Sequence, residues 1–333
     1  MEVTLDDAFS AFQPELPVAV GFSGGADSTA LLHACATRWP GQISAVHINH
    51  GLQAAAAAFE QQCVRVCCHL NVPLTVIPVP ARAKPGESPE AAARTARYEG
   101  FAQFVHKSHA SVAIKNIALG HHADDQLETF LIALSRGAGL AGLSAMPHRL
   151  ERQGVTYWRP LLQVSAAEIR RWLADKQLEF REDPSNLDTR FLRNRIRHQV
   201  LPALKQTFAQ LQQPVARSLA HIAQAKDLLD EIAVVDLAAV MKGPPGSPGP
   251  HIQLLQTLSP NRQVNVVRHW LAFQYRVIPS NAQLTELLRQ VADCTTRGHQ
   301  IEIRVADGQV VRRGDCLAWY NPQGVQAVEG AGK

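Results

Sequence analysis

The sequence lacks the features that direct a chain into or across a membrane. No apolar run approaches the ~20 residues that a membrane-spanning helix requires. The N-terminal segment MEVTLDDAFS is acidic and does not have the basic and then apolar order of a signal peptide. The 333 residues are 46% apolar and 19% charged, which is typical of a globular protein with room for two domains. We therefore expect a cytoplasmic protein that makes no membrane contact.

Paired cysteines are also missing. None of the six cysteines forms a Cys-x-x-Cys pair, and six in a chain of this length do not indicate a disulfide framework. Cys63 and Cys67 lie four positions apart on a predicted helix, so they share one face. We interpret them as small buried apolar side chains.

The loop GFSGGADS, residues 21 to 28, has the glycines of a phosphate-binding loop but lacks its lysine. Gly24 and Gly25 permit positive φ and close approach of a ligand, while Ser23 and Ser28 supply hydroxyl groups. The common phosphate loop ends in Gly-Lys-Ser/Thr, whereas this one carries Asp27. A carboxylate beside phosphates requires an intervening cation, for which Mg²⁺ is the natural choice. Taken alone, the loop equally fits an ordinary glycine-rich turn that caps a helix.

Acidic residues are missing from one long stretch of the second half. Residues 1 to 148 carry a net charge of −3 and residues 149 to 333 a net charge of +7. Between Asp188 and Asp227 there is no acid, but there are seven basic residues: Arg190, Arg193, Arg195, Arg197, Lys205, Arg217 and Lys226. This pattern indicates a surface for a polyanion, although a solvated helical face has the same composition.

Apolar runs alternate with amphipathic stretches through the first half. The runs predict strands at residues 18 to 23, 43 to 50, 74 to 80 and 116 to 122, and the stretches between and after them predict helices at 28 to 38, 54 to 70, 89 to 109 and 124 to 136. This alternation predicts an α/β fold with a doubly wound, mainly parallel sheet. Ligands bind at the carboxyl ends of such strands, where GFSGGADS, HINHGL and GHHADD all lie.

A second unit follows the predicted sheet. Residues 156 to 162 read as one more strand, residues 165 to 178 as a helix with Ser165 at its N-cap, and residues 214 to 241 as a long helix. The segment GPPGSPGP breaks regular structure, and the alternation around Asp307-Gly308 predicts a hairpin. We predict a domain over residues 1 to 205, a helical linker over 206 to 245, and a small α+β domain over 246 to 333.

The segment GHHADDQLET concentrates polar groups at the end of a predicted buried strand. His121 is followed by Asp124 and Asp125 at a helix start, and Glu128 lies one turn after Asp124, which predicts that these two acids act together. Paired acids at a helix N-terminus also serve simply as capping groups. A transition-metal site is a weaker alternative because no His-x-x-x-His or cysteine ligand set supports it. Its ligands would be His47, His50, His121 and His122.

Several segments together carry a family resemblance. They are SGGADS, HINHGL, AARTARY (92 to 98), GHHADDQLETFLIALSRGAGLAGLSAMP (120 to 147), RPLL and DPSNLDTRFLRNRIR, in this order over about residues 15 to 205. The chain resembles the tRNA(Ile)-lysidine synthetase family of the PP-loop ATP pyrophosphatase superfamily. The resemblance implies that residues 1 to 205 form a PP-loop catalytic domain. It extends more weakly to residues 246 to 333, which it identifies with the tRNA-binding domain of the family.

The resemblance implies a tRNA modification ligase. Such an enzyme uses ATP and Mg²⁺ to attach free L-lysine to C2 of the wobble cytidine in a tRNA(Ile) with a CAU anticodon. Its loop grips a departing pyrophosphate, so AMP is formed through an adenylated tRNA and no loop lysine is needed. No protein partner is implied, and the existence of a homodimer is left open.

The resemblance also implies roles for individual residues. ATP binding is expected at Ser23, Gly24, Gly25, Ala26, Asp27 and Ser28, with Asp27 as the Mg²⁺ ligand. Asp27, His121 and Asp125 are the candidate catalytic residues, and Arg97 is a candidate contact of phosphate or adenylate. Either Asp124 or Asp125 would hold or deprotonate the amine of lysine. The candidate tRNA contacts are Arg159, Arg193, Arg195 and Arg197, of which Arg195 could instead brace the domain junction.

Two other functions remain as alternatives. A PP-loop tRNA thiolation enzyme uses the same adenylation, but it generally carries Cys-x-x-Cys pairs or catalytic cysteines, which have no recognisable counterpart here. A non-catalytic ATP-binding protein could share the strand-loop-helix site, but it would not need the basic stretch between Asp188 and Asp227.

Overall fold

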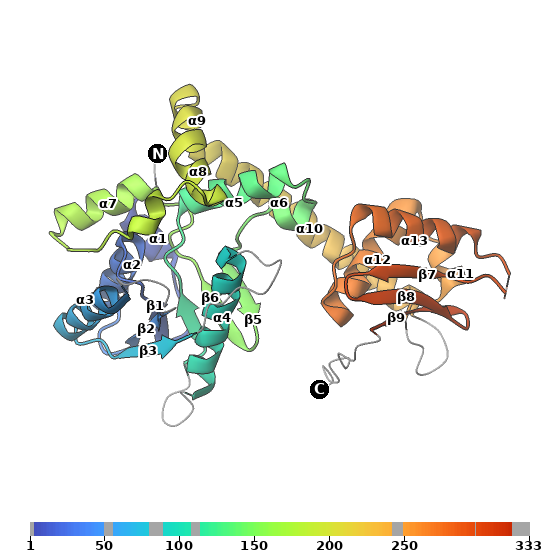
Figure 1. Ribbon diagram of the computed structural model, residues 1–333, viewed down its shortest axis with the longest axis horizontal. Helices are drawn as coiled ribbons and strands as arrows, with labels where there is room; N and C mark the ends of the chain where they lie inside the picture. The colour runs from blue at the N-terminus through green and yellow to red at the C-terminus, as the bar shows by residue number, and fades with distance from the viewer. Residues whose placement is uncertain are drawn as a thin grey trace. The chain divides into compact units, whose positions relative to one another are not determined.

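The computed structural model describes residues 3–49, 56–79, 89–107, 114–241, 249–296 and 298–321. The chain divides into two compact units, Met1–Ile222 and Ala223–Lys333, and the division falls inside the long helix α10 (Gln212–Val240) (Figure 1). The predicted boundaries at 205 and 245 bracket this helix and stay predictions. None of the helices in the described ranges is long and apolar enough to cross a membrane.

A six-stranded, mainly parallel sheet organises the first unit, as predicted. Its strand order is β3-β2-β1-β4-β6-β5, in which only the pairing of β5 with β6 is antiparallel. The strands are β1 (Val18–Gly21), β2 (Ile43–Asn49), β3 (Leu74–Pro78), β4 (Asn116–Ala118), β5 (Arg149–Arg152) and β6 (Val155–Trp158).

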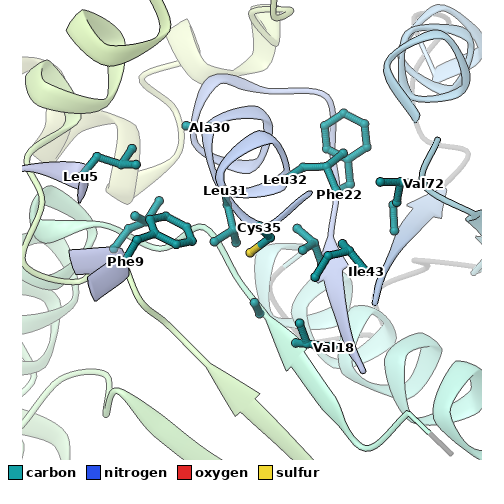
Figure 2. Close-up of a cluster of buried hydrophobic side chains, with 14 of the residues drawn as sticks. Leu5, Phe9, Val18, Phe22, Ala30, Leu31, Leu32, Cys35, Ile43 and Val72 are labelled. Carbon is teal, nitrogen blue, oxygen red and sulfur yellow. The ribbon is translucent and has the colours of Figure 1, made fainter. Parts of the chain in front are cut away.

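Apolar side chains alternate between the two faces of this sheet. On one face, Val18 and Val20 pack with Leu31 of α2 in the cluster drawn in Figure 2. On the other face, Ala19 and Ile117 pack with residues of α4. Because both faces are covered, the central strands β1, β2 and β4 are largely apolar, which is the pattern that made them predictable. The sheet is therefore a buried layer whose carboxyl edge carries the polar loops.

The helices of the first unit cover both faces of the sheet and extend beyond its edge. Helices α1, α2, α3 and α7 share the first core cluster, and α4 forms the second. The helices before the basic stretch are α1 (Leu5–Ala11), α2 (Ala26–Arg38), α3 (Ala56–His69), α4 (Pro89–Lys107), α5 (Ala123–Ser135), α6 (Leu140–Leu143) and α7 (Ala166–Asp175). After α7 come the 3₁₀ turn η2 (Pro184–Leu187), α8 (Leu192–Arg195), the π-helical segment η3 (Ile196–Val200) and α9 (Leu201–Thr207).

One strand differs from the sequence-based expectation. The strand predicted over residues 156 to 162 ends at Trp158, and a turn follows it at Pro160. A hairpin that was not predicted pairs this strand with β5 through Gln153 and Gly154, which have φ of 53° and 74°. Two consecutive positive φ angles define a tight hairpin turn. The antiparallel edge strand was missed because it is short and mostly exposed.

The second unit is a small α+β domain, as predicted. Besides the end of α10 it contains α11 (Ile252–Gln256), α12 (Pro260–Tyr275), α13 (Asn281–Asp293) and a sheet of order β7-β8-β9. Its strands are β7 (Glu302–Val305), β8 (Gly308–Arg313) and β9 (Cys316–Tyr320), all antiparallel. The hairpin predicted around Asp307-Gly308 joins β7 to β8, with Ala306 and Asp307 as its turn residues, and the fully buried Trp270 of α12 lies in this core.

Candidate functional site

The SGG loop connects β1 to α2 and is fixed by its own hydrogen bonds. Gly24 has φ of 84°, and a Cβ there would lie 3.3 Å from the sulfur of Cys63. The hydroxyl of Ser28 donates to the carbonyl of Gly25 at 3.1 Å and lies 3.0 Å from the hydroxyl of Ser23. No side chain caps α2, whose N-cap is Gly25. The amides of its first turn are therefore available to an anion such as a phosphate.

Gly120 lets the end of β4 approach this loop closely. A Cβ at this position would lie 3.0 Å from the carbonyl carbon and oxygen of Asp27 and 3.1 Å from the amide nitrogen of Ser28. These are backbone atoms, so they could yield only if the start of α2 moved. The close contact brings the GHHADD segment against the phosphate loop, as the predicted convergence of strand ends requires.

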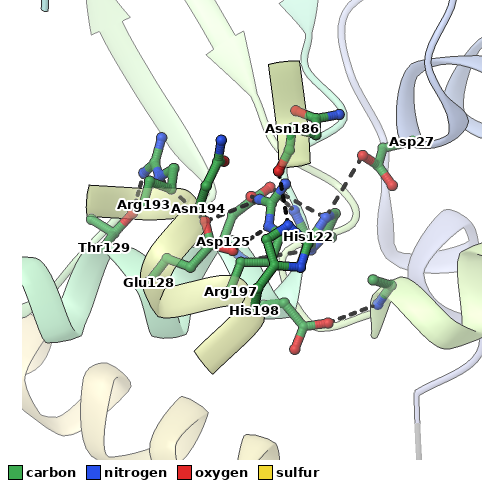
Figure 3. Close-up of polar contacts among 12 residues, drawn as sticks. Asp27, His122, Asp125, Glu128, Thr129, Asn186, Arg193, Asn194, Arg197 and His198 are labelled. Carbon is green, nitrogen blue, oxygen red and sulfur yellow. Dashed lines mark hydrogen bonds and ion pairs between the residues drawn. The ribbon is translucent and has the colours of Figure 1, made fainter. Parts of the chain in front are cut away.

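His122 links the phosphate loop to the acids of α5 (Figure 3). As the N-cap of α5, its Nδ1 accepts from the amide of Asp125 at 3.4 Å, and the Asp125 carboxylate accepts from the amide of His122 at 3.1 Å. Because Nδ1 is an acceptor, the ring proton lies on Nε2. Nε2 is 3.7 Å from Asp27 Oδ2 and 3.6 Å from Asp125 Oδ2. The ring thus faces one carboxylate from each element.

The two linked carboxylates differ in their electrostatics. Burial raises the pKa of Asp27, and the charge of Asp125 adds to the rise, although 40% of the Asp27 side chain is exposed. Burial also opposes ionisation of Asp125, but His122, His121 and Arg197 outweigh it and lower the pKa of Asp125. A bound cation would therefore favour the ionised form of Asp27, whereas Asp125 already has the charge of Arg197 at 3.0 Å.

Two arginines of the basic stretch point inward to α5. The Arg197 guanidinium contacts Glu128 at 2.6 Å and 3.0 Å and Asp125 at 3.0 Å. Arg193 lies 3.2 Å from the same fully buried Glu128 and donates to the Thr129 hydroxyl at 3.0 Å (Figure 3). These contacts join α8 and η3 to α5.

Comparison with known proteins identifies both parts of the chain. The family described as PP-loop domain matches residues 2–204, and the family described as TilS substrate binding domain matches residues 251–318. The tRNA(Ile)-lysidine synthase of Polaromonas naphthalenivorans is 52% identical over 317 residues, covering 95% of this chain and 93% of the relative. The synthase of Pseudomonas putida is 38% identical over 322 residues, covering 94% and 72%.

The chain belongs to the tRNA(Ile)-lysidine synthase family. The resemblance noted in the sequence is thereby confirmed, and membership of a PP-loop family implies the use of ATP. Among solved structures, the U34-tRNA thiolase NcsA from Methanococcus maripaludis aligns with a TM-score of 0.53 and 14% identity, over 65% of this chain and 74% of that one. At this identity the match shows a shared fold only.

Cys63 and Cys67 lack the low thiol pKa that a catalytic cysteine of a thiolation enzyme would need. Cys63 lies beneath the loop, where burial raises the pKa of its thiol to about 12. Burial likewise raises the pKa of Cys67 to about 12. Neither thiol forms an appreciable thiolate at neutral pH, so neither is an active nucleophile.

The two candidate lysine-binding acids, Asp124 and Asp125, have different partners. Asp124 is 5% exposed and accepts from Lys205, from Gln212 at 2.8 Å and from the amide of Ala166 at 3.1 Å. The prediction that Asp124 acts together with Glu128 is wrong, because Glu128 pairs with Arg193 and Arg197 instead. Within this family member, Asp125 is the acid that faces the loop.

The remaining predicted residues lie in different surroundings. His121 has a buried Nδ1 without a hydrogen-bond partner in the described structure, and burial lowers its pKa to about 3. Arg97 and Arg195 are exposed on α4 and α8. Arg159 is only 1% exposed, and its guanidinium donates to the Pro147 carbonyl and the Tyr98 hydroxyl, so its place as a tRNA contact stays a prediction.

Sequence reasoning missed the bridging position of His122. It singled out His121 instead and gave His122 only the general roles of a histidine in this segment, as a phosphate ligand, a proton carrier or, less favoured, a metal ligand. The signal was its place directly before Ala123, where α5 begins, since an N-cap side chain has a fixed direction. The four-histidine metal site has no support in the described residues, which contain no metal-binding group of three or more histidine, cysteine, aspartate or glutamate side chains; His50 lies outside them.

Proposed function

We propose that this chain is a tRNA-modifying ligase that attaches L-lysine to C2 of the wobble cytidine of tRNA(Ile) with a CAU anticodon. ATP is consumed, and AMP and pyrophosphate are released through an adenylated tRNA intermediate. The observation that carries this proposal is the meeting of a lysine-free phosphate loop with His122 and Asp125 at one strand edge, in a chain with both family domains. ATP and tRNA as substrates support a cytoplasmic location.

The loop supports cleavage of ATP at its α phosphorus. The amides at the start of α2 and the hydroxyls of Ser23 and Ser28 would hold the β and γ phosphates as a departing pyrophosphate. Mg²⁺ held by Asp27 would offset the negative charge that develops on this leaving group. The fit is chemical: the described residues offer one exposed carboxylate here, and Mg²⁺ usually completes its ligands with phosphate oxygens and water. Transfer of AMP to the cytosine O2 turns a poor leaving group into a good one.

Asp125 is the better candidate for the amine of free lysine. Both acids have a basic partner, Lys205 for Asp124 and Arg197 for Asp125, but only Asp125 shares the His122 ring with Asp27 of the loop. Because its pKa is lowered, Asp125 is a weak base and a stable anion at neutral pH. We infer that it orients the lysine ammonium before attack on C2 rather than serving as the final proton acceptor.

The proposal is tested by the products and their dependence on substrates. Purified protein with ATP, Mg²⁺ and lysine should release AMP and pyrophosphate only when tRNA(Ile) with a CAU anticodon is added. Asp27→Ala should abolish release and leave tRNA binding largely intact. Asp6→Ala, which removes an exposed acid from the first turn of α1, is the matched control and should be fully active.

Three results would contradict the proposal. Formation of ADP would place the cleaved bond elsewhere in ATP. Release without tRNA would remove the RNA from the reaction. Turnover with a sulfur donor in place of lysine would favour the thiolation alternative.

A further inference from the structure

The carboxylate of Asp124 joins α5 to three other helices. Its Oδ2 accepts from the backbone amide of Ala166, the first residue of α7, at 3.1 Å. Its Oδ1 accepts from the side-chain amide of Gln212, the first residue of α10, at 2.8 Å, and from the ammonium of Lys205 on α9. Only 5% of Asp124 is exposed. Four helices therefore meet on one buried carboxylate group.

This carboxylate is the last step in a series of contacts between α5 and the basic stretch. The contacts are those of Arg193 with Thr129 and Glu128, of Arg197 with Glu128 and Asp125, and of Lys205 with Asp124 (Figure 3 shows the first two). As the basic stretch runs forward along the chain, its partners on α5 run backward. The basic stretch therefore lies along α5 in the reverse direction and ends at the first turn of that helix.

The contacts of Asp124 act on the turn of α5 that lies at the phosphate loop. The backbone of this turn is held as well, because the amide of Ala123 donates to the carbonyl of Val164 at 2.9 Å. His122 precedes the turn as its N-cap, and Asp125 belongs to it. The Nε2 atom of His122 is 3.6 Å from the Asp125 carboxylate and 3.7 Å from the carboxylate of the loop. Movement of this turn would therefore displace both residues relative to the loop.

The carboxylate of Asp124 is fully engaged by the protein itself. Burial opposes its ionisation, but the hydrogen bond and the charge of Lys205 outweigh burial and hold the pKa of Asp124 below its usual value. Hydrogen bonds to an ionised group are about twice as strong as those between neutral groups. Three donors on a buried, ionised carboxylate fix its position, which suits a group that holds helices together better than one that binds and releases a substrate.

We propose that Asp124 is a positioning residue of the reaction. This inference rests on the proposed function. Asp124 fixes the first turn of α5 against α7, α9 and the start of α10, and thereby sets the positions of His122 and Asp125 at the phosphate loop. Displacement of reacting groups by about 1 Å can lower a rate by about 100-fold. Loss of the Asp124 contacts should therefore lower kcat and leave the binding of ATP and L-lysine unchanged.

The test separates kcat from KM in the full chain, with saturating tRNA(Ile) that has a CAU anticodon. Asp124→Asn and Lys205→Met each break the ion pair, and both should lower kcat for pyrophosphate release by about tenfold or more. The KM values for ATP and L-lysine should stay at the wild-type level. Lys205→Arg retains the ion pair and should restore most of kcat. Lys176→Met, which removes an exposed lysine at the end of α7, is the matched control and should be fully active.

A double-mutant cycle tests whether Asp124 and Lys205 act as one unit. The double variant Asp124→Asn with Lys205→Met should lower kcat no further than either single change, because one change already removes the contact. Activities are measured well below the unfolding midpoint of each variant. The Lys205 side chain is 43% exposed, so Lys205→Met and Lys205→Arg carry the test if Asp124→Asn does not fold.

The outcomes separate positioning from other roles. A higher KM for L-lysine in Asp124→Asn, with a lower one in Lys205→Met, would overturn the inference, because Asp124 would then hold the substrate amine in competition with Lys205. Wild-type kcat in both variants, with lowered unfolding midpoints, would also overturn it, since the ion pair would then serve the fold alone. A wild-type chain that releases no pyrophosphate with all substrates present would instead contradict the proposed function.

Discussion

The imidazole ring of His122 caps the N-terminus of α5 and also faces two carboxylates. Its Nδ1 caps α5, which fixes the proton on Nε2 and directs it to Asp27 and Asp125. Asp27 belongs to the phosphate loop and Asp125 to α5, so the ring transmits the position of one element to the other. His122 is therefore a positioning residue, and its two nitrogen atoms can be tested separately.

We expect His122→Asn and His122→Ala to differ in stability but not in activity. Asparagine can still cap α5, whereas alanine cannot and should lower the free energy of unfolding by about 1 kcal/mol. Both variants lose the Nε2 contact with Asp27, so both should show a lower kcat for pyrophosphate release. Denaturant unfolding and steady-state kinetics check the two parts. Full activity in His122→Asn would show that the cap alone matters.

His121 should make stability depend on pH. Burial lowers its pKa from 6.5 to about 3, so between these values the unfolded chain binds a proton that the folded chain does not. Its contribution is present above pH 6.5 and is lost as the pH falls toward 3, by up to about 1.4 kcal/mol per pH unit. His121→Gln should therefore lose less unfolding free energy than wild type between pH 7 and pH 5. Equal losses in both proteins would refute this.

Sequence patterns located the site residues but not their directions. The GHHADD segment was predictable because polar residues at the end of a buried strand have few other roles. Which histidine faces the loop depends on where α5 begins, and a one-residue uncertainty there exchanges their surroundings. Asp124 and Glu128 do follow the predicted i, i+4 spacing, but tertiary partners on α9 and η3 draw them to separate ion pairs.

At the scale of elements, the approach of β4 to α2 depends on Gly120. Gly120→Ala would place a methyl group 3.0 Å from the backbone of Asp27, and overpacking of this kind costs about 1–3 kcal/mol. We expect a less stable protein whose pyrophosphate release is largely lost, because the first turn of α2 must move. Gly139→Ala is the control, since no atom lies within 4 Å of its added Cβ. Thermal unfolding and the product assay measure both effects, and a fully active Gly120→Ala would show that the loop tolerates displacement.

The predictability of the elements follows from what each one packs against. Strands β1, β2 and β4 are buried on both faces or nearly so, and their apolar runs indicate this directly. The edge strand β5 has the sequence Arg-Leu-Glu-Arg, in which only Leu150 is partly buried, so its signal is weak. The Gln153-Gly154 turn was the better clue, because both residues adopt positive φ.

At the scale of the whole molecule, the arginines behind the uneven charge distribution are of two kinds: some are exposed to solvent, and others pair with acids of the protein. The second half carries a net charge of +7 against −3 for the first half, which suits a polyanionic partner. Some of this charge is used inside the protein, since Arg193 and Arg197 neutralise Glu128 and Asp125. Charge counted along the sequence cannot distinguish a guanidinium that faces solvent from one that joins two helices.

Arg195 and Arg197 provide the test of this division, because they are two positions apart and face opposite ways. Arg195 is exposed, so Arg195→Gln should lower the salt slope of tRNA binding by about 0.7–0.9 and leave the unfolding free energy unchanged. Arg197 is hydrogen-bonded to Glu128 and Asp125, so Arg197→Gln should keep the slope and lower the unfolding free energy by about 1–3 kcal/mol. Salt titrations of tRNA affinity and denaturant unfolding of both variants give these four values. A reduced slope in Arg197→Gln would mean that its guanidinium leaves the acids of α5 to contact RNA, and the assignment of this arginine to the fold would then be wrong.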